Sequence, residues 1–92
     1  MIRENDKKII LKYAKKYDVS DIYLFGSSLE KGQHAQDIDL GVRGIQPKLF
    51  FKFYGELFKT LSKPVDLVDL SKKSLFTSLI EKDGVRIYGK PI

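Results

Sequence analysis

The fold is decided by one stretch of sequence, Leu24-Phe25-Gly26-Ser27, followed after nine residues by Asp37-Ile38-Asp39-Leu40. Apolar and polar residues alternate from Asp37 to Arg43, which predicts a strand with one buried face and one solvent face. Side chains at positions i and i+2 of a strand project to the same side. Asp37 and Asp39 are therefore expected to stand next to each other on the exposed face.

This pairing of carboxylates predicts a metal–nucleotide pocket. Adjacent carboxylates repel each other unless a cation lies between them, and Mg²⁺ prefers oxygen ligands completed by water and substrate phosphates. Gly26 allows close approach of the backbone to an anion, while the Ser27 hydroxyl and nearby free amides can hold phosphate oxygens.

Working outward, hydrophobic periodicity predicts alternating helices and strands. The expected helices are Glu4–Tyr17, Pro47–Leu61 and a segment carrying Leu75, Phe76, Leu79 and Ile80, capped by Asp69 or Ser71; the expected strands are Ile22–Phe25, Asp37–Arg43, Val65–Asp69 and Val85–Tyr88. Residues Glu30–Gln36 are expected to form a turn, or a short helix and loop. The fold class is α/β in the broad sense (α+β), a small sheet with helices mainly on one face.

The middle helix carries a broad apolar stripe, which is more typical of a core than of a ligand site. Its members are Leu49, Phe50, Phe53, Tyr54, Leu57, Phe58 and Leu61. Tyr54 and Tyr88 could stack on a base, but core or rim packing is the preferred interpretation, and no base-binding residue is assigned.

A third carboxylate is available on the strand Val65–Asp69. If Val65 and Leu67 point into the core, Asp66 faces outward with the first two aspartates, whereas Asp69 suits a cap or turn. Three carboxylates can hold two divalent ions about 3.5–4 Å apart, which stabilise the attacking and leaving oxygens of a phosphoryl displacement.

Length and composition set the remaining bounds. The 92 residues are expected to form one domain, 1–92, without cysteine, with a formal net charge of +5 and with no apolar run long enough for a membrane span or signal peptide. A cytoplasmic protein is expected. His34 is the only histidine and has no second nitrogen or sulfur ligand with which to bind zinc.

The motif Gly26-Ser27, Asp37-Ile38-Asp39 and Val65-Asp66-Leu67-Val68 resembles the nucleotidyltransferase superfamily typified by DNA polymerase beta, and within it the minimal nucleotidyltransferases of bacteria and archaea. The resemblance covers nearly the whole chain. It implies the nucleotidyltransferase fold with a mixed sheet, two Mg²⁺ ions, and transfer of a nucleoside monophosphate, AMP from ATP, to an acceptor.

The resemblance also assigns roles to the residues of the motif. It implies that Gly26 and Ser27 bind phosphate, that Asp37 and Asp39 ligate both metals, and that Asp66 ligates the catalytic metal. Many minimal members carry arginine soon after the Gly-Ser pair, so here Lys31 is expected to serve the phosphates.

At 92 residues, the chain is not expected to hold a second, acceptor-holding domain. The resemblance therefore suggests a HEPN-type protein partner, a toxin that this chain adenylylates as its antitoxin. The alternative is a non-catalytic binding module that masks its partner. Transfer to a nucleic-acid end or a small molecule is a third hypothesis, although no nucleic-acid motif accompanies the basic charge. The sequence does not set the oligomeric state, and a homo-oligomer is compatible with it.

Overall fold

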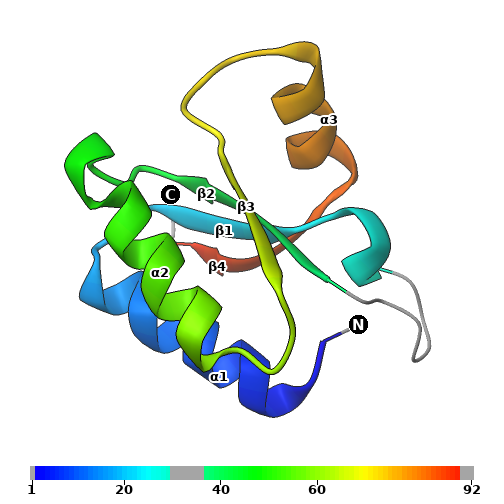
Figure 1. Ribbon diagram of the computed structural model, residues 1–92. Coiled ribbons are helices and arrows are strands. Elements are labelled where there is room, and N and C mark those ends of the chain that lie inside the picture. The colour runs from blue at the N-terminus through cyan, green and yellow to red at the C-terminus, as the bar shows by residue number, and fades with distance from the viewer. Residues whose placement is uncertain (1, 30–36, 90–92) are drawn as a thin grey trace.

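The computed structural model describes residues 2–29 and 37–89, with the Ser27 side chain excepted. In chain order the elements are α1 (Glu4–Lys16), β1 (Asp21–Leu24), the 3-10 turn η1 (Gly26–Leu29), β2 (Ile38–Arg43), the 3-10 turn η2 (Pro47–Leu49), α2 (Phe50–Thr60), β3 (Val65–Asp69), α3 (Leu75–Asp83) and β4 (Val85–Gly89) (Figure 1). The expectation for Glu30–Gln36 lies outside the described residues.

The four strands form one mixed sheet in the order β3-β2-β1-β4. β1 pairs antiparallel with both β2 and β4, and β2 pairs parallel with β3. A parallel pair needs a crossover between its strands, which η2 and α2 supply here. The mixed sheet and the alternation of helices and strands are confirmed.

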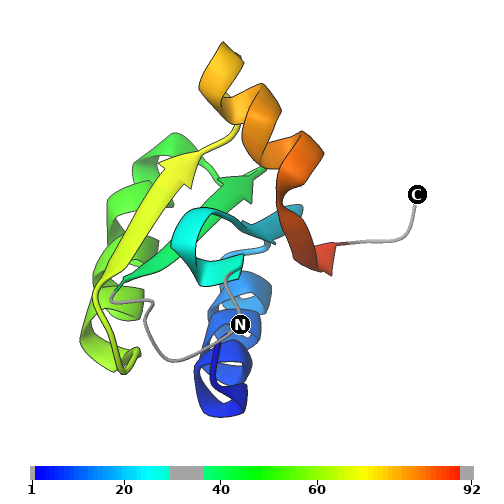
Figure 2. The same ribbon diagram turned by 90° about the vertical axis from the view of Figure 1, so that its right-hand side faces the viewer.

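Two helices cover one face of the sheet. Figures 1 and 2 show α1 and α2 together on that face, while α3 stands towards the other. The core lies between the helix pair and the sheet, because the inward residues of β1 and β2 meet the apolar stripes of both helices. Its fully buried members include Ile10, Ala14, Ile22, Leu24, Leu40, Val42, Phe53 and Leu57.

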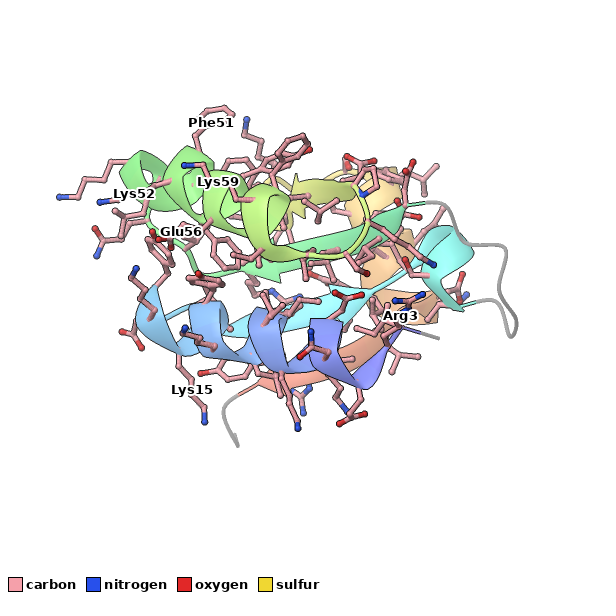
Figure 3. The ribbon with its side chains drawn as sticks, turned by 60° about the horizontal axis from the view of Figure 1, so that its bottom comes forward. Arg3, Lys15, Phe51, Lys52, Glu56 and Lys59 are labelled. Atoms are coloured by element: carbon pink, nitrogen blue, oxygen red, sulfur yellow. The ribbon has the colours of Figure 1, made fainter. Side chains whose placement is uncertain are left out.

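α1 and α2 contact each other through an aromatic pair and an ion pair. The Tyr17 and Phe53 ring centroids are 5.5 Å apart, and Lys16 Nζ lies 3.0 Å from Glu56 Oε1. In Figure 3, Glu56 lies between the two helices, whereas Phe51 points away from α1. Phe58 belongs to the predicted apolar stripe but is 64% exposed, because the stripe is wider than the face that α1 and the sheet can cover.

Two helix starts differ from the sequence expectations. Pro47 begins a 3-10 turn, and the α-helical part starts at Phe50. The cap of α3 is Ser74, not Asp69 or Ser71. The Ser74 hydroxyl accepts a hydrogen bond from the Thr77 amide at 3.1 Å, while the Thr77 hydroxyl accepts one from the Ser74 amide at 2.9 Å, a reciprocal capping box.

The later start of α3 has a physical cause in the sheet. The Leu70 amide donates to the Val42 carbonyl at 2.8 Å, so the chain is still held to β2 after β3 ends.

Among the described helices, none is long and apolar enough to cross a membrane.

Candidate active site

Two of the three candidate carboxylates occupy matching positions on neighbouring strands. Asp39 of β2 and Asp66 of β3 are Cα partners in the parallel register. On each strand the two flanking residues are buried: Ile38 and Leu40 on β2, and Val65 and Leu67 on β3. The aspartates therefore project from the opposite face, side by side, with Asp39 half-buried and Asp66 exposed. The strand parity predicted for Asp66 is confirmed.

Asp37 lies immediately before β2 and is exposed. It lines a small cavity together with Ser28 and with Arg3 and Asp6 at the start of α1. Among residues 2–29 and 37–89, no three carboxylate or histidine side chains lie close enough together to enclose a metal ion. The backbone thus pairs Asp39 with Asp66, while Asp37 lies just before the strand.

Gly26 brings the end of β1 against the Asp39 carboxylate. A Cβ atom at Gly26 would lie 2.8 Å from Asp39 Oδ2, closer than real Cβ atoms approach another atom. Its φ of +60° is also in the left-handed region that favours glycine. Both observations explain why glycine stands here, because the turn has to pass directly beside the carboxylate.

Ser28 is a site residue that the sequence reasoning did not select. Its side chain is 1% exposed, and its Oγ accepts a hydrogen bond from the Asp39 amide at 2.7 Å. The Ser28 hydroxyl also makes a long hydrogen bond, 3.5 Å, to the Asp37 carbonyl. The signal that could have revealed it is a second serine directly after the Gly-Ser pair, in a turn that leaves an apolar strand.

The predicted phosphate contacts are only partly within the described chain. Gly26 and Ser27 form the first half of η1, in the turn beside Asp39. Lys31 and His34 lie outside the described residues, so the phosphate contact expected of Lys31 stays a prediction.

The residues set aside as alternatives have structural contacts. Asp69 Oδ1 accepts a hydrogen bond from the Ser71 amide at 2.9 Å, which makes Asp69 a turn residue. The Tyr54 hydroxyl donates to the Val65 carbonyl at 3.0 Å, and Tyr54 and Tyr88 both pack against the core. Core or rim packing is thus confirmed for both tyrosines.

The far end of the same sheet face is closed by ion pairs. Arg43 Nη1 donates to Asp21 Oδ2 at 3.1 Å, and Arg43 Nη2 contacts Glu81 of α3. The hydrogen bond to Glu81 raises the pKa of Arg43, so the guanidinium stays charged and ties α3 to β2. Towards the other end of this face, Asp39 is half-buried and Asp66 is exposed.

The donor set fits a hard divalent cation. Carboxylate oxygens are the ligands that Mg²⁺ selects, and it commonly binds to one or two of them together with substrate phosphates. Asp39 and Asp66 supply two such groups on adjacent strands, and Gly26 has no Cβ to collide with the Asp39 carboxylate. The arrangement suits a metal-assisted reaction of a phosphate ester.

Residues 7–91 match the family described as "Polymerase beta, Nucleotidyltransferase". A search of curated proteins by sequence found no match. The fold is also similar to solved structures of toxin–antitoxin complexes. A structure of the MntA–HpeT toxin–antitoxin, a Y104A mutant, has 28% identity and a TM-score of 0.73 over 98% of this chain and 75% of its own. A toxin–antitoxin structure with AMP-PNP has 27% identity and a TM-score of 0.74 over 91% and 73%.

A third structure contains a tri-AMPylated HEPN toxin of Shewanella oneidensis in complex with an MNT antitoxin. It has 24% identity and a TM-score of 0.73, covering 97% of this chain and 74% of that chain. At this identity it shows the shared fold.

Proposed function

This chain belongs to the polymerase beta nucleotidyltransferase family, and on that premise we propose that it transfers AMP from ATP to a HEPN-type partner protein in the cytoplasm and thereby acts as the partner's antitoxin. The observation that carries the proposal is the in-register pair Asp39 and Asp66, with the Gly26 turn pressed against the Asp39 carboxylate.

The proposed reaction joins a hydroxyl oxygen of the partner to the α-phosphorus of ATP. The bond from the α-phosphorus to the oxygen that bridges to the β-phosphate breaks, and pyrophosphate leaves. Asp66 takes the proton of the attacking hydroxyl, a role that suits its exposed position on β3. The turn at Gly26 and Ser27, with Lys31, holds the triphosphate.

Members of this superfamily generally depend on metal ions, and we assign two Mg²⁺ ions to this site. Asp37 and Asp39 are the proposed ligands of both ions, and Asp66 completes the catalytic one. When bound, the ions neutralise the charge that develops on the attacking and leaving oxygens.

A protein partner is supported by the neighbouring structures and by the surface of this chain. Those structures are toxin–antitoxin complexes, one with an ATP analogue and one with an AMPylated HEPN toxin. On this chain, Phe51 is 79% exposed and Leu75 is 80% exposed. Apolar side chains of this size become favourable contacts when another protein covers them.

Binding and neutralisation measured on the same samples test this proposal. The chain and the proposed HEPN-type partner are co-purified, and the ribonuclease activity of the partner is measured with wild-type and Asp39→Asn protein. We expect the variant to bind the partner and to lose neutralisation. Equal neutralisation by both proteins would instead establish the alternative, a non-catalytic module that masks its partner.

A further inference from the structure

The hydroxyl of Ser28 performs a task that the proposed reaction leaves unassigned. At the end of β1, the Phe25 amide donates to the Asp39 carbonyl at 3.1 Å, the last backbone bond between the two strands at this end. The chain then turns away at Gly26, whose φ is +60°. The Asp39 amide is the next backbone group of β2 on the side that faces β1. Because the chain has turned away, no strand lies opposite this amide.

Ser28 takes the place of the missing strand. The Asp39 amide donates to Ser28 Oγ at 2.7 Å, and the Ser28 hydroxyl donates to the Asp37 carbonyl in a long hydrogen bond of 3.5 Å. Ser28 is itself held in place, because its amide donates to the Phe25 carbonyl at 3.2 Å and its side chain is 1% exposed. One buried hydroxyl thus connects the turn to the backbone of both aspartates.

We propose that Ser28 is a positioning residue that fixes Asp37 and Asp39 in the orientation required for metal binding. The inference rests on the proposed function, because it assumes that these aspartates ligate the metal. Ser28 does not touch the metal or the nucleotide in this scheme. It holds the backbone from which the ligands project, and groups that orient metal ligands commonly change metal affinity about 10–100-fold when they are removed.

A hydroxyl is the group that this position requires. It accepts a hydrogen bond from one residue and donates to the other, whereas alanine can do neither. A cavity of about 30 Å³ adjoins Ser28, and threonine adds only one methyl group to the side chain while keeping its hydroxyl. Threonine is thus the conservative replacement that should preserve the connection.

The test measures metal binding directly, without turnover. Binding of Mn²⁺ alone, without nucleotide, is followed by the loss of the free Mn²⁺ signal in electron paramagnetic resonance. The proteins are wild type, Ser28→Ala, Ser28→Thr and Asp39→Asn. The control is Thr77→Ala, which removes another buried hydroxyl that donates to a carbonyl, that of Lys72 at 2.9 Å, in the cap of α3.

We expect Mn²⁺ affinity to fall at least about tenfold in Ser28→Ala, to return to near the wild-type value in Ser28→Thr, and to be unchanged in Thr77→Ala. Wild-type affinity in Ser28→Ala, with binding still lost in Asp39→Asn, would overturn the role of Ser28 and leave the proposed function standing. Equal binding by wild type and Asp39→Asn would overturn both.

Circular dichroism shows whether each variant is folded. If Ser28→Ala does not fold, Ser28→Cys replaces it, because cysteine keeps the approximate size of the side chain but is a weak hydrogen-bond acceptor. Reduced Mn²⁺ affinity in folded Ser28→Cys supports the positioning role. Failure of both variants to fold would overturn it and assign Ser28 to stability alone.

Discussion

Replacing Gly26 with alanine should separate the stability of the fold from the binding of nucleotide. The new Cβ would lie 2.8 Å from Asp39 Oδ2, about 0.6 Å short of the 3.4 Å at which ordinary contact begins. The next two atoms of Asp39, Cγ and Cβ, would lie 3.5 and 3.7 Å away, which is ordinary contact. The conflict therefore involves one carboxylate oxygen, and a rotation of the carboxylate about its broad terminal torsion relieves it at small cost.

The energetic consequence for folding is consequently modest. A residue with a Cβ in the left-handed region costs about 1–2 kcal/mol relative to glycine, and the rotated carboxylate adds little. Domains of this size are stable by about 5–15 kcal/mol, so Gly26→Ala should remain folded, with a melting temperature lower by about 4–8 °C for each kcal/mol. The rotated Asp39 carboxylate, by contrast, is expected to be a poorer ligand for Mg²⁺, and the binding of Mg²⁺ with nucleotide should weaken.

The assay is calorimetric titration of AMP-PNP with Mg²⁺ into wild type, Gly26→Ala and Gly55→Ala. Gly55 is the matched control, because it lies inside α2 and a Cβ there would meet no atom within 4 Å. We expect Gly55→Ala to bind as wild type and to gain about 0.5–1 kcal/mol of stability. Gly26→Ala should remain folded and lose at least about tenfold in affinity. Wild-type affinity in Gly26→Ala would refute the reasoning, because the contact with Asp39 would then have no bearing on the site.

Three further changes test the fold that carries the site. Gly41→Ala places a Cβ 2.9 Å from Leu70 Cδ1 in a buried strand. This overpacking should lower the free energy of unfolding, measured by urea titration, by about 1–3 kcal/mol. An unchanged midpoint of the titration would show that Leu70 moves aside freely. Ser74→Ala removes the cap of α3 and should cost about 1 kcal/mol in the same titration, whereas no loss would mean that the capping box contributes nothing to stability. Glu56 beside the hydroxyl raises the pKa of Tyr17 from 10.0 to about 12, so the folded state favours the protonated hydroxyl and this stabilisation is complete below pH 10. The stability of wild type relative to Tyr17→Phe should therefore fall as the pH rises from 10 towards 12, and a difference that does not change with pH would contradict the assignment.

The strand parity of the aspartates could be predicted because it depends only on local alternation. Val65 and Leu67 had to face the core, which left Asp66 on the outer face, and the parallel pairing then placed it beside Asp39. The sequence could not show this pairing by itself, since register between strands is a tertiary property. The resemblance to a known family supplied the missing step.

The start of α3 and the role of Ser28 depend on contacts between distant segments. Asp69, Ser71 and Ser74 are all good cap residues by type. Leu70 is still bonded to β2 and Ser71 is held in a turn by Asp69, so the helix begins where the capping box of Ser74 forms. Ser28 acquires its partners only after the chain from Gly26 folds back towards β2. Local propensity contains neither contact, so the sequence alone left both undetermined.

The most direct test of the central claim is transfer of AMP to the HEPN-type partner. The partner is incubated with this chain, Mg²⁺ and ATP labelled at the α-phosphate, and the label that becomes covalently attached to the partner is counted for wild type, Asp39→Asn and Asp69→Asn. Asp69 provides the matched control. It is also an aspartate of β3, but its carboxylate accepts a hydrogen bond from the Ser71 amide in a turn. We expect labelling by wild type and by Asp69→Asn, and none by Asp39→Asn. Equal labelling by wild type and Asp39→Asn, or none with folded wild type bound to its partner, would contradict it.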